Sequence, residues 1–315
     1  MNAKAKKHLK KSRRNSNAVE VDDLEHSGIV GTVVDTGRFP ALKLEQPRGV
    51  PERFVAIDRA ALLTERLVPE TAQARRSADQ YRHIKRPLLN RIKGLQAEGH
   101  ADAQLIMMAS ALPGDGKTFT SLNLAFSIAR EKDSSVLLVD GDVLKPHISH
   151  VFGVENEPGL MDALAEERLD AESLVLATDI PGFSLLPAGR QHESATELLA
   201  SKRMAAVATQ LAQNNPRRIL LFDSPPLLLS SESRALSAVM RHVVLVVRAG
   251  GTLRQAVLDA VECLRDKENV DVIFNQSQLA VMHGSYGYGD YRGYGRGTSV
   301  GMEDTVGTPA GKAWQ

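Results

Sequence analysis

Apolar and polar positions along the middle of the chain alternate in blocks that predict strands and helices in turn. Runs rich in Val, Ile and Leu occur at 105–109 and near 135–139, 183–187, 218–222, 242–247 and 269–274. Helical patterns fill 117–131, 159–166, 195–214, 231–240 and 252–267. Near-continuous apolar strands that alternate with helices are typical of a parallel sheet covered on both faces. We therefore expect an α/β fold with a doubly wound, mostly parallel sheet.

The flanking segments lack this alternation. Residues 1–27 are polar and basic without periodicity, which indicates disorder. Short β-like runs follow at 29–34 and 54–57, and then an amphipathic helix is predicted from about 70 to 98, with a break or kink at Pro87. Residues 283–297, HGSYGYGDYRGYGRG, have no basis for a core. We expect four parts: a basic, largely disordered extension (1–50), a helical docking or oligomerisation segment (51–100), a main domain (101–280) and a flexible tail (281–315).

Composition and charge limit the functional classes. The chain of 315 residues is 43% hydrophobic, which suffices for a core, and its single cysteine, Cys263, cannot form an internal disulfide. No apolar run reaches 18 residues, so we expect a cytoplasmic protein. Residues 1–14 carry seven basic side chains and no acidic one, which leaves a net charge of −6 on the rest. That basic segment could contact anionic lipid or nucleic acid, or could simply be solvated.

The segment QLIMMASALPGDGKT (104–118) has the strongest chemical pattern. An apolar strand, a turn rich in Gly and Pro ending in Gly-Lys-Thr, and a helical pattern are the context of a phosphate-binding loop. Lys117 would reach the β- and γ-phosphates of ATP, and the Thr118 hydroxyl would bind Mg²⁺. Ala111 stands where the motif usually opens with Gly. The residues expected to contact the nucleotide are Pro113, Gly114, Asp115, Gly116, Lys117, Thr118 and Phe119.

Acidic residues follow two further predicted strands. Asp140 and Asp142 end VLLVDGD, and their spacing of two would point both carboxylates the same way on an extended segment. One could organise Mg²⁺ and its waters, while the other accepts a proton from an attacking hydroxyl. Asp223 ends ILLFD and would complete the Mg²⁺ arrangement. Ligands bind at the carboxyl ends of such strands, so we expect these groups to meet the loop.

Together these motifs resemble the bacterial tyrosine kinases, the cytosolic kinase domains that accompany polysaccharide export machines. The resemblance rests on PGDGKT, DGDVLKP and DSPP in this order, and on PGLMDALA, LLPAGR and FNQS. The variant IKRPLL, with GKTFTSLNLA, is most similar to the branch found beside exosortase-type exopolysaccharide clusters. The resemblance implies the three-layer fold of P-loop NTPases and an ATP- and Mg²⁺-dependent transfer of phosphate to protein tyrosine.

The family's residue roles extend to the matching positions. The resemblance implies that Lys117 and Thr118 bind nucleotide and metal, and that Asp140 activates the acceptor tyrosine. It implies that Asp142 and Asp223 organise Mg²⁺. The helix containing DQYRHIK is similar to the family's oligomerisation helix, although Asp79 and Lys85 replace its usual Glu and Arg while Arg82 is retained. A Lys cannot reproduce the bidentate fork of Arg, which weakens the expected homo-oligomer.

The sequence also offers an acceptor. Four of the five tyrosines lie within nine residues of the Gly-rich tail, at Tyr286, Tyr288, Tyr291 and Tyr294. At about 3.3 Å per residue, the stretch from Leu279 to Tyr294 could span about 50 Å and reach a neighbouring subunit. We therefore expect an autokinase that phosphorylates this cluster and regulates exopolysaccharide biosynthesis or export.

Other interpretations remain open at this point. A ParA/MinD-like positioning ATPase has a second Lys near the start of the loop, where this chain has Leu112. A non-catalytic, ATP-binding scaffold of a polysaccharide assembly machine is a third possibility, and a role in nucleic-acid binding has little support. The resemblance further implies a membrane-embedded polysaccharide co-polymerase as activator, which would recruit the kinase to the inner face of the cell membrane.

Overall fold

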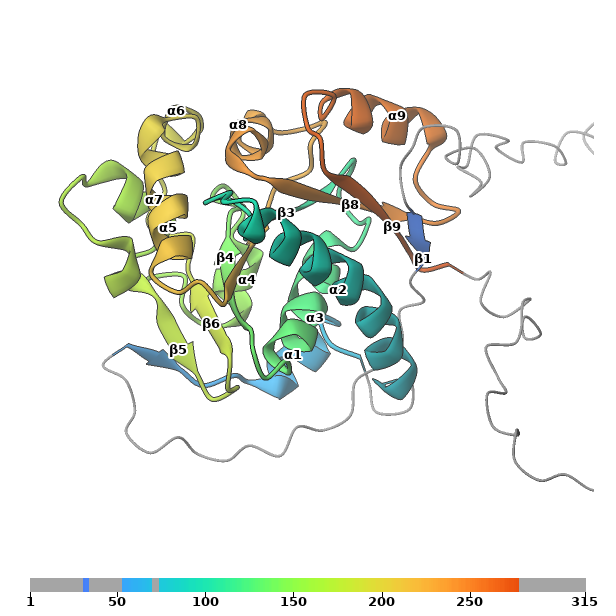
Figure 1. The fold of residues 1–315 in the computed structure, drawn as a ribbon, viewed down its shortest axis with the longest axis horizontal. Helices are drawn as coiled ribbons and strands as arrows, with labels where there is room; N and C mark the ends of the chain where they lie inside the picture. The colour runs from blue at the N-terminus through green and yellow to red at the C-terminus, as the bar shows by residue number, and fades with distance from the viewer. Residues whose placement is uncertain (1–30, 34–52, 70–73, 278–315) are drawn as a thin grey trace, which may run out of the picture. The chain divides into compact units, whose positions relative to one another are not determined.

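The computed structural model describes residues 31–33, 53–69 and 74–277, so the basic segment 1–14 and the four clustered tyrosines lie outside the described residues. Within that part of the chain, nine strands form one sheet (Figure 1). The strands are β1 (Gly31–Val33), β2 (Phe54–Val55), β3 (Leu105–Ser110), β4 (Ser135–Asp140), β5 (Leu176–Thr178), β6 (Phe183–Leu186), β7 (Arg218–Asp223), β8 (His242–Arg248) and β9 (Val270–Asn275). The helices are α1 (Arg59–Thr64), α2 (Ala74–Ala97), α3 (Lys117–Ala129), α4 (His147–Val151), α5 (Leu160–Ala165), α6 (Ala195–Leu199), α7 (Lys202–Gln213), α8 (Ser231–Val239) and α9 (Arg254–Glu262).

The sheet brings the predicted site residues to one edge. Its strand order is β1-β9-β8-β3-β7-β4-β6-β5-β2, and every pairing is parallel apart from that of β5 with β6. Asp223, which ends β7, lies beside Met108 of β3 and beside Asp140, which ends β4. Parallel strands end at the same side of a sheet, so the loops that follow β3, β4 and β7 meet there.

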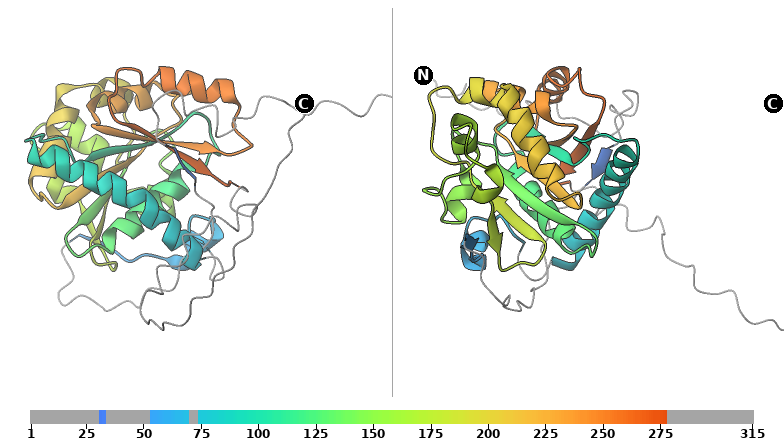
Figure 2. Two further views of the ribbon diagram at one scale, coloured as in Figure 1. Left: turned by 45° about the vertical axis from the view of Figure 1, so that its right-hand side comes forward. Right: turned by 60° about the vertical axis from the view of Figure 1, so that its left-hand side comes forward.

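Alternate residues of the central strands face two separate hydrophobic cores. In β3, Leu105 and Met107 pack into the core beneath α5, α7, α8 and α9, whereas Ile106 and Met108 pack into the core beneath α1, α2 and α3. Helices consequently cover both faces of the sheet, as the views in Figure 2 show. This arrangement follows from the two-residue period of strand side chains and confirms the predicted doubly wound α/β architecture.

Helix α2 is part of this packing. Its buried apolar side chains Tyr81, Ile84, Leu88 and Ile92 recur every three or four residues and so form one stripe against the second core. The opposite face of the helix is exposed. None of the helices in the described ranges is long and apolar enough to cross a membrane.

The structure differs from the sequence prediction in two helices. The single helix expected at 195–214 was wrong: α6 ends at Leu199 and α7 starts at Lys202. The Ser201 hydroxyl accepts a hydrogen bond from the Met204 amide at 3.2 Å and caps α7, which favours a new helix start over continuation. The break expected at Pro87 is absent: α2 continues through this exposed residue, and its buried side chains pack on the core on both sides of it.

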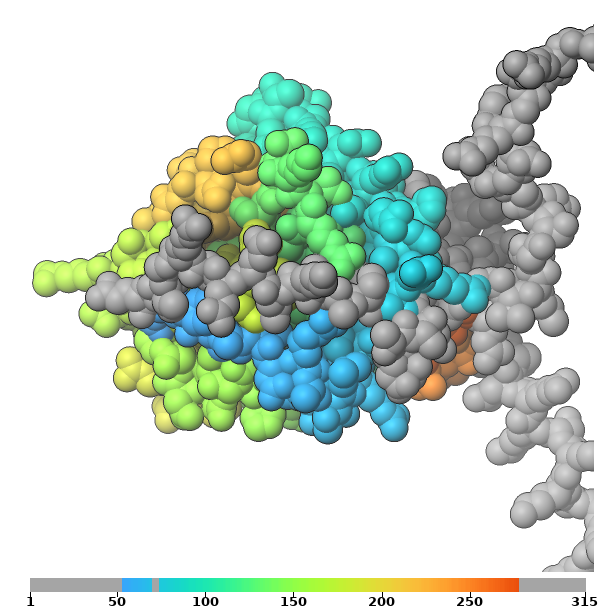
Figure 3. Space-filling model, turned by 90° about the horizontal axis from the view of Figure 1, so that it is seen from below, coloured from blue at the N-terminus to red at the C-terminus, as the bar shows by residue number. Residues whose placement is uncertain are grey.

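Three short elements were not expected from the pattern. Helix α1 begins after Asp58, whose Oδ1 accepts hydrogen bonds from the amides of Ala60 and Ala61, and it lies on the molecular surface (blue in Figure 3). Helix α4 has five residues, and β5 has three and pairs antiparallel with β6. Elements this short carry too few residues to display a period.

Candidate active site

The loop between β3 and α3 is shaped to surround an anion. Gly114 and Gly116 adopt φ values of +84° and +89°, in the left-handed region that favours glycine. A Cβ atom at Gly116 would collide with the side-chain amide nitrogen of Asn275. Ala111 is fully buried and is not among the described residues with positive φ, so the missing first glycine costs the loop no strain. Helix α3 begins at Lys117 and has no side-chain cap, and the first amides of a helix lack partners within it, which suits an anion at this end.

Lys117, Thr118 and Asp223 meet at the N-terminus of α3, as predicted. The Lys117 ammonium lies 3.1 Å from Asp223 Oδ1, and the Thr118 hydroxyl donates to Asp223 Oδ2 at 2.8 Å. Ser121, one helical turn after Lys117, donates to Asp223 Oδ1 at 2.7 Å. Asp223 is 1% exposed, so these partners compensate for the burial of its charge.

Asp140 and Asp142 lie in different environments, although they are two residues apart. Asp140 is fully buried, and its Oδ2 accepts hydrogen bonds from both the amide and the hydroxyl of Ser149 at 2.7 Å. Burial raises the pKa of the Asp140 carboxyl to about 7. Asp142 is only half-buried. Burial raises its pKa as well, and the positive charge of Lys117 opposes that rise. Asp142 is thus the more exposed of these two carboxyls, and the charge of Lys117 acts on it as well as on Asp223.

Asp115 faces the protein rather than the loop opening. Its carboxylate accepts hydrogen bonds from the Leu112 amide at 3.1 Å and from the Thr252 hydroxyl at 2.6 Å. The side-chain amide of Asn275 donates to the Asp115 carbonyl at 2.9 Å. Thr252 and Asn275 thus connect the loop to the C-terminal sides of β8 and β9. We call Asp115, Thr252 and Asn275 the loop clamp.

The other residues expected at the nucleotide differ in exposure. Pro113 and Gly114 are exposed at the tip of the loop, and Phe119 is half-buried against the second core. Sequence reasoning missed Ser121 and Thr252, whose partners Asp223 and Asp115 are more than 100 residues away in the chain. It also missed Ser149, which lies nine residues after Asp140 but outside any motif. Asn275 lies within the FNQS motif, which was a usable signal for a functional position.

The predicted oligomerisation residues on α2 do not share one environment. Asp79 and Arg82 are exposed and form an ion pair with each other at 2.7 Å. Lys85 is 4% exposed and turns inward, where its ammonium lies 2.6 Å from the Ser127 carbonyl and 2.6 Å from Glu131. Lys85 consequently fastens α2 to the C-terminal end of α3 within the same chain.

The donor set at the loop suits a nucleotide with Mg²⁺. Backbone amides and an ammonium suit phosphate, while the Thr118 hydroxyl and the carboxylates of Asp142 and Asp223 are the hard oxygen ligands that Mg²⁺ takes. The described residues contain no group of three His, Cys, Asp or Glu side chains that could hold a metal alone. Mg²⁺ in proteins is commonly bound through one or two carboxylates together with waters and substrate phosphates.

Known proteins with related sequences are kinases. No family model matches the chain. The tyrosine-protein kinase YwqD of Bacillus subtilis (strain 168) is 32% identical over 185 residues, which are 58% of this chain and 76% of that protein. The putative tyrosine-protein kinase EpsB of Ralstonia solanacearum is 30% identical over 253 residues, 77% of this chain. The match covers only 32% of EpsB, so this chain spans about a third of its length.

Solved structures show the same fold. The kinase domain of the Escherichia coli tyrosine kinase ETK aligns with a TM-score of 0.61 at 24% identity, over 86% of this chain and 100% of that one. The chimerical protein CapA2B2 aligns with a TM-score of 0.56 at 23% identity, over 73% of this chain and 95% of that one. These matches confirm the predicted fold, which is that of the kinase domain of ETK. Because the chain covers 76% of YwqD at 32% identity, it belongs to the bacterial tyrosine kinases, which phosphorylate tyrosine residues of proteins.

Proposed function

We propose that this protein is an ATP- and Mg²⁺-dependent autokinase that phosphorylates Tyr286, Tyr288, Tyr291 and Tyr294 and thereby regulates exopolysaccharide biosynthesis or export. The observation that carries the proposal is the convergence of Lys117, Thr118 and Asp223 in a chain whose tyrosines are concentrated in one segment. Most of the chemistry is positioning and charge stabilisation, as in other phosphoryl transfers.

Each residue has a proposed part in binding ATP. The backbone N–H groups from Gly114 to Phe119 and the Lys117 ammonium hold the phosphates, while Pro113, which has no N–H group, shapes the loop beside them. Thr118, Asp142 and Asp223 hold Mg²⁺, which supplies charge neutralisation at the phosphates when bound. The Lys117–Asp223 ion pair spans 3.1 Å, so Lys117 would exchange this carboxylate for the γ-phosphate when ATP enters.

The proposed reaction moves one proton and one phosphoryl group. The tyrosine oxygen forms a bond to the γ-phosphorus while the bond from that phosphorus to the bridging oxygen of ADP breaks. A tyrosine hydroxyl has a pKa of about 10, so it needs a proton acceptor at neutral pH. Asp140 is the proposed acceptor, and its pKa of about 7 suits this task. It would have to become accessible, since it is fully buried beside Ser149.

The proposed biological setting extends the family relationship. A homo-oligomer would present the tail of one subunit to the site of the next, with residues 51–100 as the docking segment and the exposed pair Asp79 and Arg82 within it. A membrane-embedded polysaccharide co-polymerase would activate the kinase and recruit it to the inner face of the cell membrane. The IKRPLL and GKTFTSLNLA segments support a place in the exosortase-associated branch. Among the relatives, one from Klebsiella pneumoniae is named a putative tyrosine-protein kinase in the cps region.

Incubation of the purified protein with Mg²⁺ and labelled ATP, followed by mass spectrometry of residues 279–315, tests the proposal. We expect label on the four tail tyrosines, and none in a variant with all four changed to Phe. Label confined to other residues would overturn the proposed acceptor. ATP hydrolysis without any label, even with the cytoplasmic segment of a candidate membrane partner, would favour a switch ATPase. ATP binding without hydrolysis would favour a scaffold.

A further inference from the structure

Gln276 has a backbone conformation that few side chains adopt. It follows the last residue of β9, and its φ of +57° lies in the left-handed region. Among the described residues other than glycine, Arg66 is the only other one with a positive φ, at +54°. The Gln276 side chain is exposed, whereas its neighbours Asn275 and Ser277 are 1% and 2% exposed. The backbone on either side therefore imposes this conformation, and the Gln276 side chain does not.

The conformation directs the Gln276 amide at the side chain of Asn275. The Gln276 N–H donates to Asn275 Oδ1 at 2.9 Å, and Asn275 Nδ2 donates to the Asp115 carbonyl at 2.9 Å. Because the oxygen and the nitrogen of an Asn side chain lie at opposite ends of one planar group, a donor fixed at the oxygen decides where the nitrogen points. The backbone of Asn275 is held separately, since its carbonyl accepts from the Ala249 amide at 2.8 Å.

The orientation of the Asn275 side chain bears on the phosphate-binding loop. The side chain fills the space beside Gly116, the residue that precedes α3. If it turned away, the Asp115 carbonyl would lose this donor and space would open beside Gly116. The loop amides would then be free to leave the arrangement that suits phosphate.

We propose that Gln276 is a positioning residue for ATP binding, because its left-handed backbone turns the Asn275 side chain toward the phosphate-binding loop and so holds the loop in shape. The inference rests on the proposed function, in which ATP binds at this loop. Gln276 acts through its backbone and through Asn275. The effect of a substitution should therefore follow the backbone preference of the new residue rather than the chemistry of its side chain.

Substitutions that differ in their tolerance of a positive φ test the inference. Gly adopts this region without strain, and Asn adopts it more readily than most residues, so Gln276→Gly and Gln276→Asn should bind ATP at least as tightly as the wild type. Gln276→Val and Gln276→Thr introduce β-branched residues, which strongly disfavour it, and should bind ATP about tenfold more weakly in titration calorimetry. The Thr variant repeats the Val test without adding an apolar side chain to the surface. Thermal unfolding confirms that each variant is folded.

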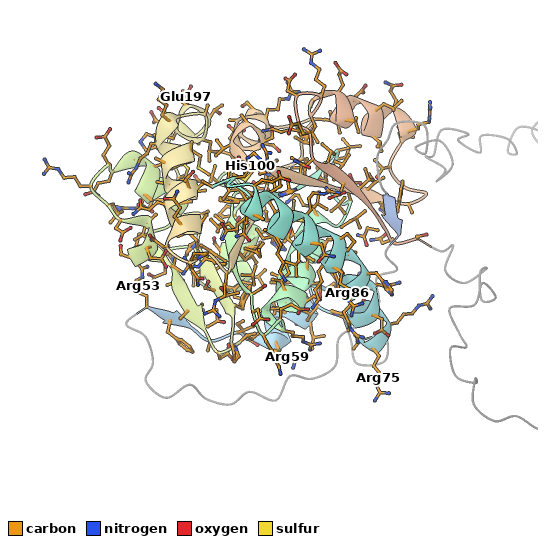
Figure 4. All side chains as sticks on the ribbon, viewed as in Figure 1. Arg53, Arg59, Arg75, Arg86, His100 and Glu197 are labelled. Carbon is orange, nitrogen blue, oxygen red and sulfur yellow. The ribbon has the colours of Figure 1, made fainter. Side chains whose placement is uncertain are left out.

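Arg66→Val serves as the control, because it places the same β-branched residue at the other exposed position with a positive φ. Arg66 directly follows the C-terminal end of α1. Figure 4 marks α1 by its first residue, Arg59, at the lower edge of the view and apart from β9. We expect Arg66→Val to lower the unfolding temperature, as Gln276→Val does, but to leave ATP affinity unchanged.

Two further measurements identify Asn275 as the residue through which Gln276 acts. NMR of the Asn275 side-chain amide, recorded without nucleotide, should give the same signal in the wild type and in Gln276→Gly, and a shifted signal in Gln276→Val. The double variant Asn275→Ala with Gln276→Val should bind ATP no more weakly than Asn275→Ala alone, since the two residues act as one unit.

Four results would overturn the inference. They are wild-type ATP affinity in both β-branched variants, equally weak binding by Gln276→Gly and Gln276→Val, additive losses in the double variant, and an unchanged Asn275 amide signal in Gln276→Val. A wild-type protein that binds no ATP would contradict the proposed function instead. The NMR comparison would then decide by itself whether Gln276 orients Asn275, because it is made without nucleotide.

Discussion

Asn275 shows how a residue outside the phosphate-binding loop can set its conformation. It ends β9, donates to the Asp115 carbonyl at 2.9 Å, and occupies the space that a side chain at Gly116 would need. Asn275→Ala would leave that buried carbonyl without its donor and open room beside Gly116. We expect ATP affinity, measured by titration calorimetry, to fall about tenfold, or by about 1.4 kcal/mol.

Two substitutions of Thr252 test the same loop clamp, one that keeps its hydroxyl and one that removes it. Thr252→Ser keeps the hydroxyl that donates to Asp115 and should retain most of the affinity, whereas Thr252→Val removes it and should behave like Asn275→Ala. Unchanged ATP affinity in both Asn275→Ala and Thr252→Val would show that the clamp does not determine nucleotide binding.

His242 makes the stability of the fold depend on pH. It starts β8 and is fully buried, and burial together with the charges of Arg91 and Arg241 lowers its pKa to about 4. The unfolded chain takes up this proton near pH 6.5, whereas the folded chain does so only near pH 4. The folded state therefore loses stability as the pH falls from about 6.5 to 4, by on the order of 2 kcal/mol.

The variant His242→Leu tests this dependence. Denaturant titrations between pH 4 and 6.5 should show a flatter decline of the unfolding free energy than in the wild type. His83→Gln, on the exposed face of α2, serves as control and should keep the wild-type slope. An identical slope for His242→Leu and the wild type would assign the dependence to other groups.

The site residues that sequence analysis identified are those whose position follows from a strand end. Lys117, Thr118 and Asp223 could be placed together because parallel strands end at one edge and the loop motif fixes its own order. The separate environments of Asp140 and Asp142 could not be predicted. The environment of Asp140 depends on Ser149, nine residues away in α4, which approaches only after the chain has folded.

Helix α5 and the loop after β6 are joined by backbone hydrogen bonds and an ion pair. The Leu160 amide donates to the Pro187 carbonyl at 2.8 Å, and the Met161 amide donates to the Ala188 carbonyl at 2.9 Å. Asp162 accepts from the Gly159 amide at 2.9 Å and pairs with Arg190 at 2.6 Å. The motifs PGLMDALA and LLPAGR, far apart in the chain, thus belong to a single contact.

Substitution of two glycines by alanine should change the unfolding free energy in opposite directions. One glycine is in close contact with a neighbouring backbone, and the other lies in an exposed helix where alanine has the higher helix propensity. A Cβ at Gly159 would collide with the Pro187 carbonyl oxygen, so Gly159→Ala should cost about 2 kcal/mol or more of unfolding free energy. Gly94 lies on the exposed side of α2 with nothing near its Cβ position, so Gly94→Ala should add about 0.5–1 kcal/mol. Thermal unfolding checks both, and a Gly159→Ala protein as stable as the wild type would disprove the contact.

At the level of elements, long buried runs were predicted most completely, although the short strands β1 and β2 also lie within the β-like runs expected at 29–34 and 54–57. The six central strands, β3, β4, β6, β7, β8 and β9, were found because each is a buried run of Val, Ile, Leu or Phe. The split between α6 and α7 was missed because apolar residues continue with helical spacing on both sides of Ser201. The hydrogen bond from the Met204 amide to the Ser201 hydroxyl starts a new helix although the apolar spacing continues. The spacing of apolar residues does not reveal such a cap.

Across the whole molecule, one sheet edge brings together loop, carboxylates and clamp, while the proposed acceptor lies in a segment outside the described residues. The site and the proposed acceptor tyrosines can therefore be removed separately, and phosphorylation of one chain by another can be tested. The Lys117→Met protein retains its tail tyrosines but lacks the phosphate-binding ammonium, and the protein with four tail Phe residues retains the site but lacks the acceptors.

The most direct test of the central claim mixes these two proteins with Mg²⁺ and labelled ATP. We predict label on Tyr286 to Tyr294 of the Lys117→Met chain, at a rate that rises with the concentration of the four-Phe chain, and at least about a hundredfold less label when Lys117→Met is incubated alone. Calorimetry confirms beforehand that the four-Phe protein binds ATP. Absence of label on those tyrosines in the mixture, with ATP bound, would contradict the claim that this site phosphorylates this segment.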